Sequence, residues 1–155
     1  MATVYISQKF SGLVEMLSKN NVSETGQPVF KTNMHLTIFS SLLGQNLDGD
    51  YSRYTVKNQG SEIPERIFIH NQMDSAVYLL ALHAKKDGDI LREKNDNESW
   101  KITEQYAECG FKELNNWFLD SPGSSEVDVI LNKMKEEAVS LLEQEGEIDP
   151  DKIEF

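Results

Sequence analysis

The chain has 155 residues, of which 39% are hydrophobic and 9% aromatic. That content supports one folded domain with a core of ordinary size and argues against a wholly disordered protein. The formal net charge of −11 means that the surface as a whole repels phosphate, so direct nucleic-acid binding is disfavoured.

The sequence also favours a cytosolic location. No apolar run is long enough to cross a bilayer. A secretion signal has a basic start followed by an apolar stretch, and the N-terminus lacks this pattern. A single cysteine cannot form an internal disulfide, which suits a reducing compartment. We therefore expect a cytoplasmic protein without a membrane segment.

The acidic residues gather toward the C-terminal end. Residues 1–60 hold five basic and four acidic side chains, whereas residues 136–155 hold eight acidic ones and only Lys152. We predict one mostly helical domain over residues 1–142 and an acidic tail over 143–155. The tail either keeps the protein soluble or docks on a basic partner through apolar anchors, namely Ile148, Ile153 and Phe155.

The first elements in chain order are a strand and two helices. "TVYIS" alternates apolar and polar residues, which predicts a strand over 3–7, with Ser7 turned outward and able to cap a helix through "QKFSGLVEMLSKN". "NNVSETGQP" is typical of a loop. "NMHLTIFSSLLGQNL" predicts a second helix that ends near Gly44. Its apolar residues recur at helical spacing: Met34, Ile38, Phe39, Leu42 and Leu43.

Residues 53–70 differ in character. Glycines and Pro64 separate two short β-prone pieces, "RYTV" and "RIFIH", so we predict a loop with one or two small strands there. "QMDSAVYLLALHAKK" then predicts a helix with one apolar stripe: Met73, Val77, Leu80, Ala81 and Ala84.

A long helix is predicted up to "DSPGSS", with one buried face. Tyr106, Gly110, Leu114 and Trp117 form that face, bordered by Ala107, Phe111 and Phe118, while Glu104, Glu108, Lys112, Glu113 and Asn116 fall mostly on the other side. A glycine inside a helix costs about 1 kcal/mol against alanine, so Gly110 indicates close approach by another element.

The last helix is predicted to begin at a cap of Ser124 or Ser125. It carries a clear apolar stripe, which we expect to face the core: Val127, Ile130, Leu131, Met134, Ala138, Leu141 and Leu142.

No arrangement of residues indicates catalysis, a metal or a cofactor. Cys109 has Glu108 beside it and Glu113 one turn on, and carboxylates raise the pKa of a thiol, so a structural cysteine is favoured over a nucleophile. His35, His70 and His83 form no metal-binding spacing, and no phosphate-binding, dinucleotide or nucleophile-elbow motif occurs. We predict a non-enzymatic protein.

Three segments together resemble a known family. "VFKTNMHLTIFSSLLGQNL", "ERIFIHNQMDSAVYLLALHAKKDGDIL" and "ITEQYAECGFKELNNWF" are similar, in order and spacing, to the bacterial Dnd-system-associated protein 4 family, whose members accompany DNA phosphorothioation. The matching residues are Phe30, Thr32, Leu43, Gly44, Ile67, Phe68, Leu80, Ala81, Tyr106, Ala107, Gly110 and Leu114. The sequence departs from the family pattern at Cys109, where the pattern has a glycine, and at "QNLDGDY", where it has a basic turn.

The resemblance implies a biological setting and no catalytic residue. We expect an accessory or adaptor subunit of an anti-phage defence assembly, in which Trp117, Phe118 and the acidic tail contact a larger nuclease or ATPase subunit. A homo-oligomer is also compatible with the sequence.

Two other functions stay open. The first is a DNA-binding or DNA-end-sensing module, in which the N-terminal strand, helix and helix form a ribbon-helix-helix-like dimer with Lys9 and Lys31 as phosphate contacts. The second is an acidic DNA mimic that occupies the groove of a nuclease.

Overall fold

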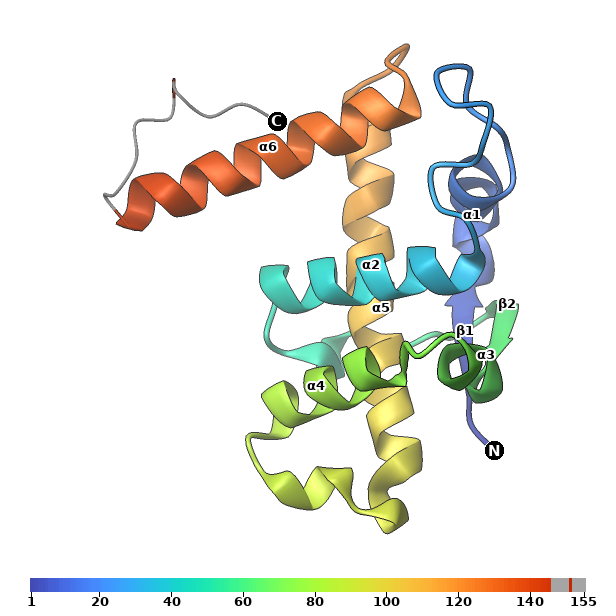
Figure 1. The fold of residues 1–155 in the computed structure, drawn as a ribbon, viewed down its shortest axis with the longest axis vertical. Helices are drawn as coiled ribbons and strands as arrows, with labels where there is room; N and C mark the ends of the chain where they lie inside the picture. The colour runs from blue at the N-terminus through green and yellow to red at the C-terminus, as the bar shows by residue number, and fades with distance from the viewer. Residues whose placement is uncertain (146–150, 152–155) are drawn as a thin grey trace. The chain divides into compact units, whose positions relative to one another are not determined.

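A computed structural model describes residues 1–145 and Asp151, and shows a mainly helical protein (Figure 1). Over these residues it contains six α-helices, short 3₁₀ turns and one two-stranded sheet. The predicted fold class is therefore confirmed. The chain forms two compact units, Met1–Asn115 and Asn116–Phe155. No helix among the described residues is long and apolar enough to span a membrane.

The sheet joins the N-terminus to the middle of the chain. The strand β1 (Thr3–Ser7) matches the prediction and pairs antiparallel with β2 (Gln59–Pro64), with Val4 opposite Ile63. The strands approach closely because Gly60 has no side chain: a Cβ there would lie 2.9 Å from the Ile6 carbonyl oxygen.

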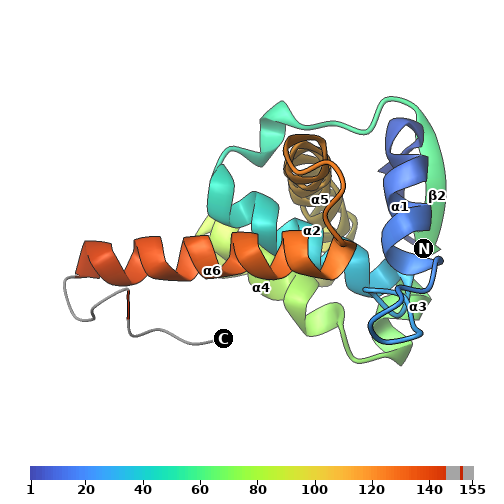
Figure 2. The ribbon, with the colours of Figure 1, turned by 90° about the horizontal axis from the view of Figure 1, so that it is seen from above.

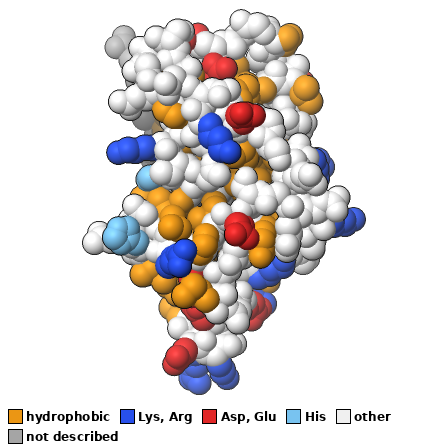
Figure 3. Space-filling model, turned by 90° about the vertical axis from the view of Figure 1, so that its right-hand side faces the viewer, with side chains coloured by type: hydrophobic (Ala, Val, Ile, Leu, Met, Phe, Trp, Pro, Cys, Tyr) orange, Lys and Arg blue, Asp and Glu red, His pale blue; other side chains and the backbone are white. Residues whose placement is uncertain are grey.

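The β pieces predicted as "RYTV" and "RIFIH" are wrong in position. Residues 51–53 form a 3₁₀ turn, and Glu65–His70 form the helix α3 rather than a strand. Its isoleucines favour a strand by propensity alone, but only Phe68 is buried, against Trp100 with ring centroids 5.2 Å apart. Ile67 and Ile69 remain exposed. Figure 3 shows the face that lies on the right-hand side in Figure 1, with hydrophobic side chains gathered over its middle.

The helix α1 (Ser11–Ser18) follows a 3₁₀ turn at Gln8–Phe10 and packs its apolar residues inward as predicted. Phe10 stacks on Phe111, with ring centroids 5.7 Å apart. Ser7 does not cap this segment through its side chain and is buried rather than outward-facing. Its hydroxyl is used elsewhere, as described below.

The helix α5 (Asp96–Asp120) is the centre of the first unit, and the other elements pack around it. Figure 2 looks nearly along α5, with α1, α2 and the connection from α2 to β2 around it. The predicted face of Tyr106, Gly110, Leu114 and Trp117 is buried, and so are Ile102 and Phe111 beyond it. The assignment of Glu104 and Glu108 to the solvent side is wrong, because these side chains are only 3% and 5% exposed.

The helix α2 (Asn33–Leu47) crosses α5 through small residues. Ser40, Ser41 and Gly44 face α5, whereas Leu42 from the predicted apolar stripe is exposed. Gly44 does not end the helix, which continues to Leu47. The predicted apolar stripe does not mark the face of α2 that contacts α5, because two backbones that approach this closely leave room only for small side chains.

Both glycines of this crossing are required by space. A Cβ on Gly110 would lie 1.8 Å from the Ser40 carbonyl oxygen, and one on Gly44 would lie 2.0 Å from the Tyr106 carbonyl oxygen. The Ser41 hydroxyl donates a hydrogen bond to the Thr103 carbonyl at 3.1 Å across the same contact. The close approach predicted at Gly110 is confirmed.

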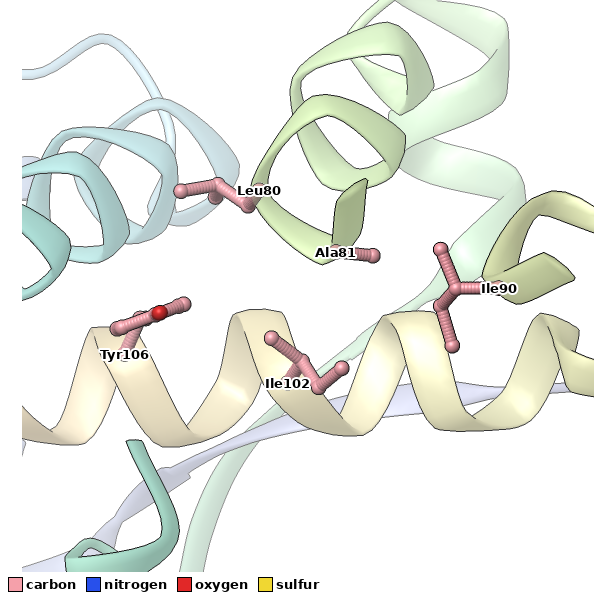
Figure 4. Close-up of a cluster of buried hydrophobic side chains, with 5 residues drawn as sticks. All are labelled: Leu80, Ala81, Ile90, Ile102 and Tyr106. Carbon is pink, nitrogen blue, oxygen red and sulfur yellow. The ribbon is translucent and has the colours of Figure 1, made fainter. Parts of the chain in front are cut away.

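The helix α4 (Asp74–Lys85) packs on α5 from another side. Leu80 and Ala81 of α4 meet Ile90, Ile102 and Tyr106 in a buried cluster (Figure 4). This cluster agrees with the predicted α4 stripe, of which Val77 is also buried.

The second unit contains the end of α5 and the helix α6 (Glu126–Glu145). Ser125 caps α6 as predicted, because its hydroxyl accepts a hydrogen bond from the Asp128 backbone N–H at 3.2 Å. The expectation that the whole stripe faces a core is wrong. Ile130 is buried, but Leu131, Met134 and Leu141 are 52%, 46% and 51% exposed.

Candidate functional site

A cleft of the first unit lies where three distant parts of the chain meet. It has a volume of about 690 Å³. One wall is the end of β1 and the following turn, the second is the segment before β2, and the third is α5. The lining residues are Ser7, Gln8, Lys9, Arg53, Tyr54, Thr55, Lys57, Asn58, Glu108 and Lys112.

The floor of this cleft contains a buried carboxylate. The Ser7 hydroxyl donates to the two Glu108 oxygens, at 2.7 and 2.8 Å, and the Lys9 ammonium lies 3.4 Å from Oε1. A buried carboxylate needs such partners because removing it from water is costly. The Glu108 side chain therefore fixes both Ser7 and Lys9 against α5.

A second buried carboxylate, one turn earlier on α5, holds β1 itself. Glu104 accepts a hydrogen bond from the Tyr5 backbone N–H at 2.8 Å and one from the Lys101 ammonium at 2.7 Å. The N–H that another strand would use is thus occupied within the chain. Together, Glu104 and Glu108 join the strand to the central helix.

Hydrogen bonds and ion pairs around Asp48 hold the segment before β2 in place. The Tyr54 hydroxyl donates to Asp48 at 3.0 Å, and the Arg53 guanidinium lies 3.4 Å from Asp48 and 3.5 Å from Asp50. The Asp50 backbone N–H donates to Asp48 and is the main reason that the pKa of Asp48 is lowered. This network positions Arg53 and Tyr54 at the cleft.

Cys109 follows the cleft residue Glu108 on α5 and is buried. Its thiol is 6% exposed and donates weakly to the Gly44 carbonyl, 3.8 Å away. Burial is the main cause that raises its pKa, and Asp48 and Glu113 raise it further. The thiolate is therefore disfavoured, and Cys109 is a packing residue of the α2–α5 crossing. The thiol in turn raises the pKa of Tyr54.

The histidines do not converge on a site. His35 bonds the cap residue Thr32 at 2.7 Å, His83 bonds Gln45 at 2.8 Å, and His70 is exposed at the end of α3. Within residues 1–145 and Asp151, no group of three His, Cys, Asp or Glu side chains is placed to hold a metal ion.

Comparison with known proteins places the chain in a family. The family described as DNA sulphur modification system-associated protein 4 matches residues 4–153. The chain belongs to this family. No curated protein and no solved structure matches it significantly.

The residues that carried the family resemblance are mostly structural. Tyr106, Ala107 and Leu114 are buried on α5, and Gly44 and Gly110 form the α2–α5 crossing. The other matching residues that are buried are Phe68, Leu80 and Ala81. Thr32 caps α2 by accepting a hydrogen bond from the His35 backbone N–H at 3.2 Å. In this member of the DNA sulphur modification system-associated protein 4 family, most of these positions thus pack the core, form the α2–α5 crossing or cap α2.

The residues predicted as partner contacts are spread over the second unit. Trp117 is only 5% exposed, which agrees with its predicted place on the buried face of α5 and leaves little of it for a partner, and Phe118 is partly buried. Ile148, Ile153 and Phe155 lie outside the described residues.

The predicted phosphate contacts are not brought together. Lys9 lines the cleft and is ion-paired with Glu108, whereas Lys31 is an exposed loop residue that does not line it.

Sequence reasoning named Lys9 but missed the cleft itself and the other residues that line it. One signal was available: the apolar residues of α5 form a wide arc that includes Ile102, Leu114 and Phe111, and Glu104 lies at its edge. A glutamate at such an edge needs a partner when the arc is buried. No comparable signal brings Arg53 and Lys57 to α5, because those contacts are tertiary.

Proposed function

We propose that this protein is a non-enzymatic accessory subunit that joins a larger nuclease or ATPase in a cytoplasmic, anti-phage restriction assembly linked to DNA phosphorothioation. Membership of the DNA sulphur modification system-associated protein 4 family is the observation that carries the proposal. Two features of the chain support an adaptor role.

The first feature is an apolar seam on α6. Leu131, Met134, Ala138 and Leu141 follow one another at spacings of three, four and three residues, which is the pattern by which one helix pairs with another. Three of these four side chains are about half exposed, so the seam offers apolar area to a partner. It is two heptads long, which suits a short helix laid along it better than a long coiled coil.

The second feature is the charge of the same helix. Residues 126–145 contain six acidic and two basic side chains. Two copies of α6 side by side in parallel would repel each other, whereas a partner helix with basic flanks would be attracted. The predicted acidic tail would extend this preference. We therefore propose a basic amphipathic helix of the larger subunit as the occupant of the seam.

The main alternative, a ribbon-helix-helix-like dimer on DNA, has less support. In this chain β1 pairs with β2, and the Tyr5 backbone N–H is bound to Glu104. Lys9, one of its two expected phosphate contacts, is paired with Glu108. The strand that would have to form an intermolecular ribbon is thus already engaged.

Co-purification tests the proposal. A tagged chain would be expressed with the DNA sulphur modification genes of its host, and captured proteins would be quantified by mass spectrometry. We expect the wild-type chain to retain a nuclease or ATPase encoded with those genes. The variant Leu131→Ser/Leu141→Ser should lose it, because the complex no longer buries the exposed halves of two leucines, which removes roughly 2 kcal/mol, or about 30-fold in affinity.

A matched control separates this effect from general surface change. Leu79 and Leu91 are exposed leucines of the first unit, so Leu79→Ser/Leu91→Ser removes similar apolar area elsewhere. Retention by this control and loss by the α6 variant support the adaptor role. Equal retention by both variants contradicts the seam as the docking surface.

A further inference from the structure

The cleft described above has a charge opposite to that of the protein. Its lining includes four cationic side chains, Lys9, Arg53, Lys57 and Lys112, and one carboxylate, Glu108. The whole chain, in contrast, has a formal charge of −11. Four cations around one cleft repel one another, so their convergence requires an explanation.

Fixed backbones bring these cations together. Lys9 follows β1, which Glu104 and Glu108 hold against α5. The segment of Lys57 is held to the same turn, because the Gln8 backbone N–H donates to the Asn58 carbonyl at 2.8 Å. Lys112 lies one turn after Glu108 on α5. The backbone positions of Lys9, Lys57 and Lys112 are thus fixed by hydrogen bonds and by the helix, while their side chains are exposed to solvent.

The available carboxylates do not account for all four cations. Glu108 is paired with Lys9, and Arg53 is shared between Asp48 and Asp50. Lys57 and Lys112 form no ion pair with any carboxylate of the described residues. Within the described residues, two positive charges therefore have no carboxylate partner beside a cleft that is open to solvent.

The size and lining of the cleft limit the kind of anion it suits. Pockets that hold small molecules measure about 300–1,000 Å³, and this one is about 690 Å³. Gln8, Thr55 and Asn58 add hydrogen-bonding groups, and Tyr54 adds an aromatic ring. These groups match a molecule that combines phosphate with polar and ring surfaces, as nucleotides do.

Charge screening favours a small ligand over a long nucleic acid. At physiological salt, charges interact over about 8 Å. A compact anion in the cleft therefore meets mainly its lysines and arginine, whereas an extended polyanion also meets the acidic surface. We infer that the cleft between β1, residues 53–58 and α5 binds a small phosphate-bearing ligand of nucleotide size.

This inference does not depend on the proposed docking through α6. The cleft lies within Met1–Asn115, and the seam lies on α6 in the other unit. Ligand binding is measured on the purified chain alone, so its failure leaves the co-purification result unaffected.

Titration calorimetry with three probes tests the site: pyrophosphate, adenosine triphosphate and a 5′-phosphorylated dinucleotide. The wild-type chain should bind at least one of them. Lys57→Ala/Lys112→Ala should weaken that binding by about tenfold or more, because charge-assisted hydrogen bonds to phosphate are lost. The matched control Lys19→Ala/Lys31→Ala changes the net charge equally, at exposed lysines outside the cleft.

The three probes also identify the source of the phosphate. Binding of pyrophosphate alone assigns the site to the phosphate group, preference for the triphosphate adds the nucleoside, and preference for the dinucleotide assigns a nucleic-acid end. Each of these results supports the site when the cleft variant weakens it and the control does not. Absence of binding by all three probes at millimolar concentration overturns the inference, as does equal weakening by the two double variants. A melting temperature equal to that of the wild type verifies that both double variants are folded.

Discussion

Replacing Gly110 by alanine tests the crossing of α2 and α5, on which the first unit is built. The new Cβ would lie 1.8 Å from the Ser40 carbonyl oxygen and 2.5 Å from its carbonyl carbon. Ordinary contacts of a Cβ are at least about 3.4 Å, so the two backbones would have to separate by more than 1 Å. No change of side-chain rotamer can relieve this contact, because the α5 backbone fixes the position of the Cβ and the Ser40 carbonyl belongs to the α2 backbone.

The magnitude follows from two opposing effects. Overpacking of a core costs up to about 3 kcal/mol or more, while alanine in place of glycine stabilises a helix by about 1 kcal/mol. With the overpacking cost taken as about 3 kcal/mol, we expect a net loss of about 2 kcal/mol in the free energy of unfolding. At about 4 °C per kcal/mol, the melting temperature should fall by roughly 8 °C.

Urea denaturation and differential scanning calorimetry measure this loss, and Gly12 provides the control. Gly12 lies in α1 with nothing within 4 Å of the position that a Cβ would occupy, so Gly12→Ala should leave stability unchanged or slightly raised. A Gly110→Ala variant as stable as the wild type would refute the close crossing.

Four further predictions concern the Glu104 carboxylate, the Cys109 thiol and the tail. Glu104→Ala leaves the partly buried Tyr5 N–H without its acceptor and should cost about 2 kcal/mol in urea denaturation, whereas the exposed Glu62→Ala should cost less than about 0.5 kcal/mol; equal losses would contradict the role of Glu104. Burial raises the pKa of Cys109 above its ordinary 9.0, so the folded state keeps a proton that the unfolded state releases. The contribution of the protonated Cys109 thiol to the free energy of unfolding should be complete below pH 9 and decline as the pH rises further. The Cys109→Ser variant should therefore lose less stability at alkaline pH than the wild type. In the native protein at pH 8, alkylation of the thiol by iodoacetamide should be much slower than in denaturant, and rapid native labelling would show an accessible thiolate. Deleting residues 143–155 should weaken co-purification with the larger subunit, and unchanged co-purification would count against a role for the tail.

The sequence predicts those parts of the fold that periodicity controls. The strand β1, the helices α2, α4, α5 and α6, and the buried face of α5 all follow from spacing. The close approach at Gly110 follows from energetics, because an interior glycine needs a compensating contact. Here the local pattern and the tertiary structure agree.

Periodicity fails where burial does not follow hydrophobicity. At the α2–α5 crossing, Ser40, Ser41 and Gly44 are buried because they are small, and Leu42 is left exposed. On α5, Glu104 and Glu108 are buried because β1 supplies donors from about a hundred residues away. Apolar spacing cannot distinguish these cases from solvent-facing positions.

The site is less predictable than the fold for the same reason. The cleft combines residues 7–9, 53–58 and 108–112, and no local pattern links these segments. The stripe on α6 is visible in the sequence, but spacing alone does not show whether a core or a partner covers it.

Hydrogen exchange of α6 with and without its partner tests the central claim most directly. The chain would be measured alone and in complex with the co-purified nuclease or ATPase, and backbone amides of residues 131–141 would be compared. The proposed docking predicts slower exchange across this stretch in the complex, with little change at the exposed leucines of the control, Leu79 and Leu91. Unchanged exchange over residues 131–141 in a stable complex would contradict α6 as the surface through which this protein acts.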